Sequence, residues 1–326
     1  MYKTNLAWPR WLFGRTESSQ AVRSPREVIS ACQRIARQPL DEGVARREVS
    51  DYWTESGAYN YDKTWRPRLE LIARVIEAGE ISLPRVLAEV LRQVEKKRNE
   101  ELQPCCYVSF NEKVQLPHVG GGYLHRGAVI RTVAELCTPD TDCVIELGSG
   151  WGEHLCNLWL SGGPTKAHYY ACELSEHGRK CSLVLGELDA AFQLQAPGFN
   201  YVAPRFDFLP ERQKELVVYS VHSVEQVSEV APDLIDRLCD QAEVVKGMHM
   251  EPIGWQMIPE EGWNEVTKNH AARCSEMRYN KNMWSLLKHA EARGLIAIDK
   301  AIPNFFGLEH NPASLIVWHK LGRSGT

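Results

Sequence analysis

The chain has 326 residues, of which 44% are hydrophobic and 25% charged, and this composition excludes collagen, long disorder and low-complexity repeats. The formal net charge of -4 divides into +3 over residues 1–115 and -7 over the remainder. The clustered positive charge that a nucleic-acid enzyme needs is therefore missing from the second part of the chain. No apolar run is long enough for a transmembrane helix, and Pro9 with nearby charges interrupts the segment where a signal peptide would lie.

The ten cysteines form no CxxC pair and show no metal-ligand spacing. We therefore expect reduced, mostly buried thiols in a cytoplasmic protein.

The first 115 residues are predicted to be a helical region rich in tryptophan. Ser24-Pro25-Arg26-Glu27 is a capping box with proline at the first helical position, and an apolar stripe follows it. Further elements of this region are expected as helices over 67–78 and after Ser82, a hairpin of 107–110 with 113–116, and a flexible glycine stretch at 118–122.

From Gly127 onward, predicted helices and strands alternate. The helices are expected at 128–136, 151–160, 175–190, 232–240 and 276–292. The strands are expected at 143–147, 167–173, a stretch ending near Phe206, 216–220, 244–250, 295–301 and 314–319, with a polar insertion at 252–275. Such alternation favours a doubly wound, mostly parallel sheet with its ligand at the carboxyl ends of the strands. We therefore divide the chain into a helical N-terminal region, 1–115, and an α/β domain, 116–326.

The strongest motif is Glu146-Leu147-Gly148-Ser149-Gly150-Trp151-Gly152, which follows an apolar strand and opens a helix. Glycines let the backbone turn tightly and approach a ligand, and the helix start offers unpaired N–H groups. The motif is not the dinucleotide GxGxxG, because Glu153 occupies the position of the third glycine. Its negative charge at the helix start would oppose a pyrophosphate, so an NAD site is disfavoured.

This acid-x-Gly-x-Gly-x-Gly pattern resembles the first motif of the class I S-adenosylmethionine (SAM)-dependent methyltransferases. The resemblance covers roughly residues 115–320 and implies a Rossmann-like sheet of seven mostly parallel strands, whose last strand is antiparallel, with SAM as the cofactor. The resemblance assigns the following residues to the cofactor: Glu146, Gly148, Ser149, Gly150, Gly152, Glu173, Leu174, Asp207, Phe208 and Ser220.

The resemblance also implies roles for four acidic and apolar residues among these. Glu173 lies 25 residues after Gly148, at the end of the second strand, where a carboxylate accepts hydrogen bonds from both ribose hydroxyls. Asp207 would accept from the adenine amino group while Phe208 packs on the ring. Glu146 would help to order the loop near the methionine amino group, although a carboxylate at a strand end can instead bond loop amides.

The acceptor chemistry decides whether a base is needed. A sugar or aliphatic hydroxyl requires one, and a phenol or an ammonium benefits from one. His222, at the end of the predicted fourth strand, is the best candidate, with Glu225 one short turn onward. The alternative is that His222 caps the next helix or bonds a backbone carbonyl.

His249 and Glu251 stand at the end of the predicted fifth strand, on one face by strand alternation. They are further catalytic candidates, either as a base with its orienting carboxylate or as two metal ligands, while for at least one of them packing alone is the expected role. Because no third ligand is marked, we expect no metal. Four polar or aromatic side chains are candidates for substrate binding: Tyr279, Asn280, Trp255 and Tyr59. Asn280 and Tyr279 are equally suited to cap a helix, and Trp53, Tyr59 and Tyr61 could form an aromatic lid or simply pack.

We expect the chain to transfer a methyl group from SAM to a hydroxyl or amine of a small polar molecule or short peptide, in a pocket roofed by the N-terminal helices. Two alternatives remain: a SAM-binding scaffold that has lost catalysis, and an aminopropyltransferase on the same fold. The second ranks low, because few carboxylates line the strand ends to bind a polyamine. Neither a nucleic acid nor a membrane is expected as a partner, and a homo-oligomer stays open.

Overall fold

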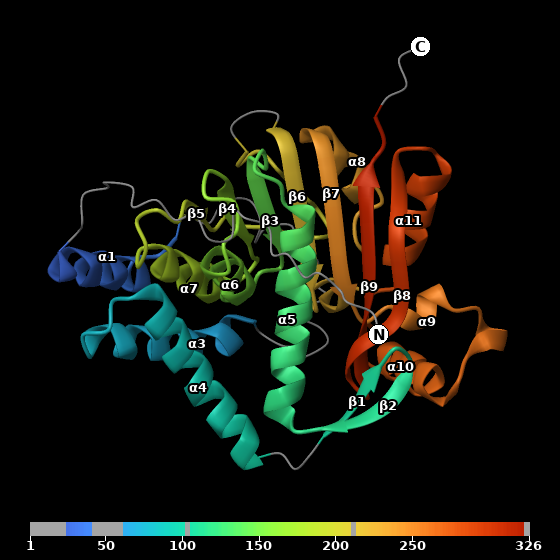
Figure 1. Cartoon of the computed structure of the whole chain (residues 1–326), viewed down its shortest axis with the longest axis horizontal. Coiled ribbons are helices and arrows are strands. Elements are labelled where there is room, and N and C mark those ends of the chain that lie inside the picture. Colours follow the sequence, from blue (N-terminus) through green and yellow to red (C-terminus); the bar gives the residue numbers. More distant parts are fainter. Residues whose placement is uncertain (1–23, 41–60, 102–104, 210–212, 323–326) are drawn as a thin grey trace, which may run out of the picture.

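The computed structural model describes residues 24–40, 61–101, 105–209 and 213–322. At its centre is a nine-stranded mixed sheet with the order β2-β1-β8-β9-β7-β6-β3-β4-β5 (Figure 1). The strands are β1 Cys105–Ser109, β2 Glu112–Leu116, β3 Cys143–Leu147, β4 His168–Cys172, β5 Leu194–Gln195, β6 Gln213–Val221, β7 Ala242–Glu251, β8 Ile296–Leu308 and β9 Asn311–Lys320.

The strands β5-β4-β3-β6-β7 pair in parallel, in the order that a doubly wound fold gives to its first five strands. The last strand, β9, is antiparallel and lies between β7 and β8. The predicted hairpin β1–β2 is confirmed, and its turn residues Phe110 and Asn111 have φ of 50° and 66°, as a two-residue hairpin turn requires. Because β1 also pairs with β8, the sheet has nine strands rather than the seven expected.

Helices cover both faces of the sheet. On one face, α5 (His118–Leu136), α6 (Glu153–Leu160) and α7 (Glu176–Gly186) share a core with strand residues such as Val144 and Val217. On the other face, α8 (Leu234–Asp240) and α11 (Met283–Ala292) pack on the alternate strand residues, such as Ile145 and Val218. This alternation follows from the period of two along each strand.

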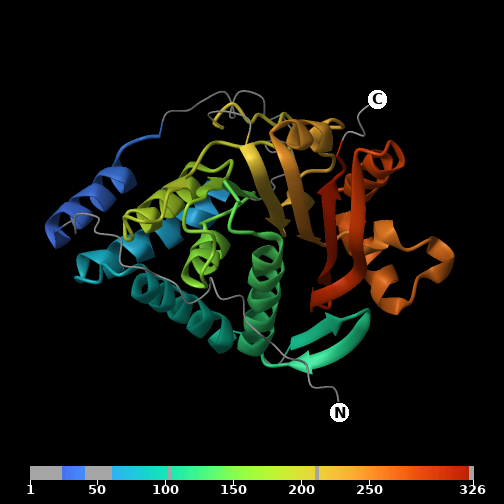
Figure 2. The same ribbon diagram turned by 45° about the horizontal axis from the view of Figure 1, so that its top comes forward.

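The N-terminal helices are α1 (Pro25–Arg37), α3 (Tyr61–Glu77) and α4 (Leu83–Glu101). They lie outside the first layer of helices, where α1 and α3 pack on α7 while α4 packs on α5 and α6 (Figures 1 and 2). The predicted capping box is confirmed at the start of α1, because Ser24 Oγ accepts from the Glu27 N–H and Glu27 accepts from the Ser24 N–H.

Three predicted elements are wrong. The glycine stretch 118–122 is the start of helix α5, and it needs Gly121 because a Cβ there would lie 2.0 Å from Cζ of Tyr107. The helix predicted at 276–292 begins only at Met283, as α11, because residues 277–282 form a turn after α10 (Glu265–Glu276), with φ of 54° at Arg278. The third parallel strand is only Leu194–Gln195, and Phe206 instead packs in the core of the other face.

Helix α10 and the short α9 (Gly254–Met257) occupy the segment predicted to be a polar insertion. Asn264 begins α10 because its Oδ1 accepts from the Thr267 N–H at 3.0 Å. All ten cysteines lie within the described residues, and none of them forms a disulfide there. Within the described ranges, no helix combines the length and the apolar character needed to cross a membrane.

Candidate active site

The carboxyl ends of β3, β4, β6 and β7 meet at one edge of the sheet. The loop after β3 bends sharply there, with φ of 68°, 57° and 80° at Gly148, Gly150 and Gly152. The loop is held to β4 because the N–H groups of Gly148 and Ser149 both donate to the Cys172 carbonyl, at 2.7 and 3.0 Å. These left-handed conformations are the reason for glycine at the three positions.

The glycines are also required by close packing. A Cβ on Gly150 would lie 2.7 Å from Cζ2 of Trp65, which α3 supplies, and one on Gly152 would lie 2.5 Å from Ser182 Oγ on α7. The loop therefore has no room for side chains at these positions, and the N-terminal helix α3 lies directly on it.

Glu173, at the end of β4, holds the glycine loop through its carboxylate. Oε2 accepts from the Gly150 N–H at 2.9 Å and Oε1 from the Ser175 N–H at 2.8 Å. The side chain is 6% exposed, and this burial raises the pKa of Glu173, while the hydrogen bonds oppose the rise. An ionised carboxylate has about four lone-pair sites, so oxygen positions remain for a ligand. Leu174 follows as a half-buried residue before α7.

Glu146 does not bond the loop amides. Its Oε1 lies 2.7 Å from Nδ1 of His154 on α6, and its Oε2 accepts from the Tyr219 hydroxyl at 3.3 Å. Burial raises the pKa of Glu146. Burial alone would lower the pKa of His154, but the adjacent carboxylate outweighs it, so the pKa of His154 is raised. Glu146 thus acts on the loop indirectly, because it binds His154 in α6, the helix that follows the loop.

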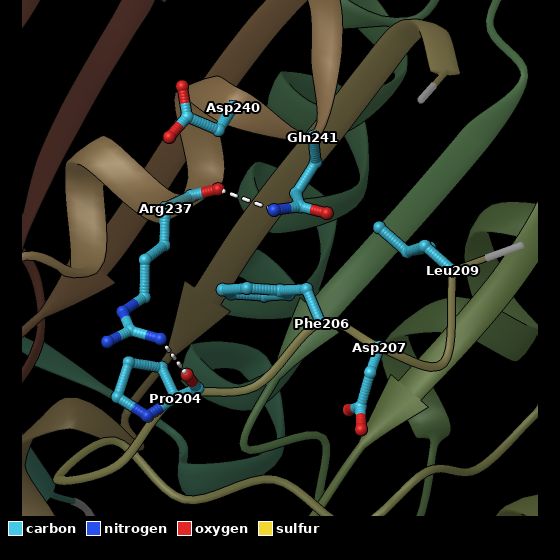
Figure 3. A pocket seen from close by; sticks show the side chains of 7 residues that line it. All are labelled: Pro204, Phe206, Asp207, Leu209, Arg237, Asp240 and Gln241. Carbon is cyan, nitrogen blue, oxygen red and sulfur yellow. Dashed lines mark hydrogen bonds between the residues drawn. The ribbon is translucent and has the colours of Figure 1, made fainter. Parts of the chain in front are cut away.

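Asp207 and Phe208 lie away from this edge. Asp207 is exposed, is paired with Arg205 at 2.7 Å, and lines an open pocket of about 360 Å³ together with Gln241, the residue before β7 (Figure 3). Phe208 packs on Tyr170, in the middle of β4. The structure therefore separates both from the glycine loop, because the chain leaves the sheet soon after β5 and returns toward the start of β6.

Asn200, which was not predicted, lies at the end of the third parallel strand, where Asp207 was expected. Gly198 forms a parallel bridge with Glu173, so the segment directly after it ends the third parallel strand beside that carboxylate. Asn200 is 7% exposed, and its Oδ1 accepts from the Val202 N–H at 2.9 Å. The signal was Pro197-Gly198, which ends a strand earlier than an apolar pattern alone suggests.

Three buried polar atoms around the glycine loop have no hydrogen-bond partner among the described residues: Ser149 Oγ, Asn200 Nδ2 and Trp65 Nε1. Buried polar groups are normally satisfied, so such a cluster suits a polar ligand that supplies the partners. The buried carboxylate of Glu173 and these unpartnered atoms together fit the hydroxyl, amino and carboxylate groups of SAM.

His222 stands at the end of β6 with the Glu225 carboxylate beside it. Its Nδ1 lies 3.4 Å from Glu225 Oε2, and the same oxygen accepts from Asn311 Nδ2 at 2.9 Å. Gln226 donates to the other oxygen of Glu225 at 2.9 Å. Burial would lower the pKa of His222, but the hydrogen bond and charge of Glu225 outweigh it, so the pKa is raised above the ordinary 6.5.

A second histidine, His125 of α5, faces His222 and was not predicted. The two ring centroids are 5.3 Å apart, and Phe306 of β8 lies 6.5 Å from the ring of His125. Burial, followed by the charge of His222, holds the pKa of His125 well below 6.5, so its ring stays neutral. At the end of β6, His222 therefore has a raised pKa, whereas the adjacent His125 has a lowered pKa.

The other strand-end candidates are fully buried. His249 shares a hydrogen bond with Ser220, between Nδ1 and Oγ at 2.9 Å, and burial lowers the pKa of His249 to about 3. Glu251 accepts from the backbone N–H groups of Ser223 and Val224, at 3.0 and 3.2 Å for Oε2. Burial raises the pKa of Glu251 to about 7. Glu251 thus holds the loop that follows His222.

The predicted substrate residues are only partly gathered. Asn280 is buried and holds the start of α11 in place, because its Oδ1 accepts from the N–H groups of Asn282, the N-cap residue, and Met283 at 3.1 and 2.8 Å. Tyr279 is half-buried, and burial raises the pKa of its hydroxyl to about 12. Trp255 is half-buried on α9, while Tyr59 lies outside the described residues, as does Trp53. No trio of His, Cys, Asp or Glu side chains within the described ranges is placed to hold a metal ion.

No protein-family model matches the sequence, and no curated protein sequence is significantly similar to it. Solved structures are similar in fold. They include a magnesium protoporphyrin IX methyltransferase from Synechocystis PCC 6803, with 14% identity, a TM-score of 0.42, and coverage of 65% of this chain and 90% of that one. An O-methyltransferase family protein from Burkholderia thailandensis has 10% identity and a TM-score of 0.42, over 61% of this chain and 57% of that one.

A geranyl diphosphate methyltransferase has 11% identity and a TM-score of 0.41, over 60% of this chain and 78% of its own. Such values transfer no substrate and no residue role. The fold is defined by the strand order of the sheet, the antiparallel β9 and the glycine loop after β3. The chain has a doubly wound α/β fold whose last strand is antiparallel, the arrangement that the resemblance of its glycine motif to the class I SAM-dependent methyltransferases implies.

Proposed function

We propose that the protein transfers a methyl group from SAM to a hydroxyl or amine of a small polar molecule or short peptide. The observation that carries the proposal is the meeting of two sets of groups at one edge of the sheet. One set is the glycine loop with buried Glu173, and the other is the His222–Glu225 pair at the end of β6.

The first set suits the cofactor. Glu173 orders the loop and has lone pairs for the ribose hydroxyls, while Asn200 offers the adenine its Nδ2, which has no partner among the described residues. When bound, SAM supplies a methyl group activated by its positively charged sulfur. Gly148 and Gly150 let the loop bend sharply beside Glu173, with Ser223 and Trp65 packed into the space that side chains at these positions would fill.

The second set suits proton removal from the acceptor. If the Nδ1–H of His222 donates to Glu225, its Nε2 is left to accept the acceptor's proton, and the imidazolium that forms is stabilised by the carboxylate. Asn311 keeps Glu225 in place. Glu251 and His249, both fully buried, hold the backbone and neighbouring strand rather than touch the acceptor.

The charge of the chain favours a small polar acceptor. The -7 balance after residue 115 disfavours nucleic acid, and the N-terminal helices stand beside the glycine loop where they could enclose a small molecule. We therefore assign residues 1–115 a substrate-enclosing role and 116–326 the transfer itself.

The test is methyl transfer with isotopically labelled methyl SAM and fractionated pools of metabolites and peptides. We expect labelled product in one pool. His222→Ala should lower its rate by about a hundred- to ten-thousand-fold, the usual scale for a general base. His319→Ala is the matched control, since His319 is exposed and paired with Asp299 near the far end of β9. Turnover by His222→Ala equal to wild type would contradict the role of His222.

The cofactor half is tested separately by calorimetry with S-adenosylhomocysteine (SAH), the product left after methyl transfer. Glu173→Gln should weaken binding by about 1.5–3 kcal/mol, the range for hydrogen bonds to a charged group. SAH binding without turnover in any pool would favour the inactive scaffold. Tighter binding of decarboxylated SAM than of SAM would favour aminopropyl transfer.

A further inference from the structure

Helix α3 lies against the glycine loop through two side chains spaced three residues apart. The six-membered ring of Trp65 occupies the space beside Gly150, with Cζ2, Cη2 and Cε2 at 2.7, 3.1 and 3.3 Å from the position of a Cβ there. The guanidinium of Arg68 lies over the ring of Trp151, 4.4 Å from its centroid. Positions i and i+3 share one face of a helix, so one face of α3 covers the loop.

The backbone of Trp65 is held in place, but its indole N–H has no hydrogen-bond partner among the described residues. Its carbonyl accepts from the Cys181 thiol of α7 at 3.9 Å, which ties α3 to the helix behind the loop. Its indole Nε1 is buried without a hydrogen-bond partner among the described residues, and so is Oγ of Ser149 in the loop itself. An indole N–H only donates, so the missing partner must be an acceptor.

A carboxylate fits these groups best. Arg68 brings a permanent positive charge to the face that carries the indole N–H, and Ser149 adds a hydroxyl donor. Glu173 is negative and would repel a carboxylate, so it suits the uncharged ribose hydroxyls instead. A ligand with a sugar at one end and a carboxylate at the other would thus extend from Glu173 past Gly150 to α3.

We propose that Trp65 and Arg68 bind the carboxylate at the amino-acid end of the cofactor, an inference that rests on the proposed function. The cofactor site is then made jointly by the N-terminal helices and the α/β domain. Helix α3 has a binding role of its own, beyond enclosing the acceptor.

The test compares two ligands that differ in this end. SAH carries the carboxylate, whereas 5′-methylthioadenosine keeps the adenosine and the sulfur but lacks the amino-acid end. By calorimetry, Trp65→Phe and Arg68→Gln should each weaken SAH about 10- to 100-fold, the scale of a hydrogen bond to a charged group. Binding of 5′-methylthioadenosine should stay within about twofold.

Matched controls are available for both substitutions. Arg66→Gln changes an exposed arginine of the same helix that is paired with Glu70, and Trp284→Phe makes the same indole-to-phenyl change on the other face of the sheet. Both should bind SAH as the wild type does. Circular dichroism and thermal unfolding check that each variant is folded, and Arg68→Gln tests the assignment even where Trp65→Phe does not fold.

Equal weakening of SAH and 5′-methylthioadenosine by both variants would overturn the assignment, because α3 would then only support the loop. Unchanged SAH binding in both variants would overturn it as well. Wild-type protein that binds neither ligand would instead contradict the proposed function and remove the basis of this inference.

Discussion

The backbone of His222 is strained where the candidate base stands. Its φ of 47° lies in the left-handed region, which costs a residue with a side chain about 1–2 kcal/mol. The conformation is held because the His222 N–H donates to the Met250 carbonyl at 3.1 Å and because Glu251 binds the two N–H groups that follow. Strain of this kind is maintained where function needs a side chain in one direction.

The protonation of His222 can be measured without knowing the acceptor. By NMR titration of labelled histidine, its pKa should lie above 6.5, because of Glu225, and should fall in Glu225→Gln, where the charge is removed. His249 is the internal reference and should stay neutral until about pH 3. A pKa unaffected by Glu225→Gln would exclude the pair. If His222 is the base, methyl transfer should slow as the pH falls through its raised pKa.

Glu251 should make stability depend on pH. Burial raises its pKa from about 4.5 to about 7, so the folded state holds a proton that the unfolded state has lost. Its contribution is fully present below about pH 4.5 and is lost as the pH rises through about 7, by about 3 kcal/mol in the free energy of unfolding. Glu251→Gln should not lose stability in this pH range. Denaturant titrations at several pH values measure the free energy of unfolding, and the same pH dependence in wild type and variant would contradict the prediction.

The sequence located Glu173 at the end of its strand but placed Asp207, rather than Asn200, at the end of the third parallel strand. A carboxylate at the end of a clear apolar strand is readable because burial and alternation mark the strand's end. The third parallel strand is two residues long and gives no such pattern, so the sequence does not show that the strand ends near Asn200 rather than near Asp207. Trp65 and His125 were also missed, because which distant side chain reaches the site depends on how helices α3 and α5 pack.

The glycine loop is the element whose shape the site needs most. Gly150→Ala should destabilise the protein through left-handed strain of about 1–2 kcal/mol and through overpacking against Trp65 of about 1–3 kcal/mol. Gly294→Ala is the matched control, since Gly294 has φ of 68° with open space around it, so only the strain applies. Thermal unfolding should rank the two. Equal destabilisation of the two variants would show that Trp65 moves aside at no cost in stability, contrary to this prediction.

Local patterns predicted most helices and strands but failed where tertiary packing overrides propensity. Three consecutive glycines disfavour a helix, yet they lie within α5. A glycine is needed at position 121 of this helix because the ring of Tyr107 occupies the space where a side chain would lie. The break between α10 and α11 depends on the left-handed conformation of Arg278 and on the hydrogen bond from the Met283 N–H to Asn280 Oδ1. The sequence does not indicate this break, because no glycine or proline lies between the two helices.

At the scale of the molecule, one arginine joins three helices. Arg126 of α5 is 18% exposed and pairs with Glu153 of α6 and, at 3.4 Å, with Glu95 of α4. It thereby connects the N-terminal helices to the helix that begins at the glycine loop. The N-terminal helices are thus linked to the α/β domain by charge as well as by apolar packing.

Arg126→Leu should destabilise the protein by about 1–3 kcal/mol, because it leaves two largely buried carboxylates without a partner. Arg131→Leu on the same helix is the control. Its pair with Glu135 is exposed, so the expected loss is within about 0.5 kcal/mol. Chemical denaturation measures both, and equal values would show that the three-helix link contributes nothing to stability.

A crystal structure of the protein with SAH tests the central claim most directly. The account predicts the ribose hydroxyls on Glu173, the adenine beside Asn200, the carboxylate at Trp65, and the sulfur facing His222. SAH bound instead in the pocket that Asp207 lines would contradict the account. A structure from crystals saturated with SAH, with no SAH at the carboxyl ends of the strands, would contradict it as well.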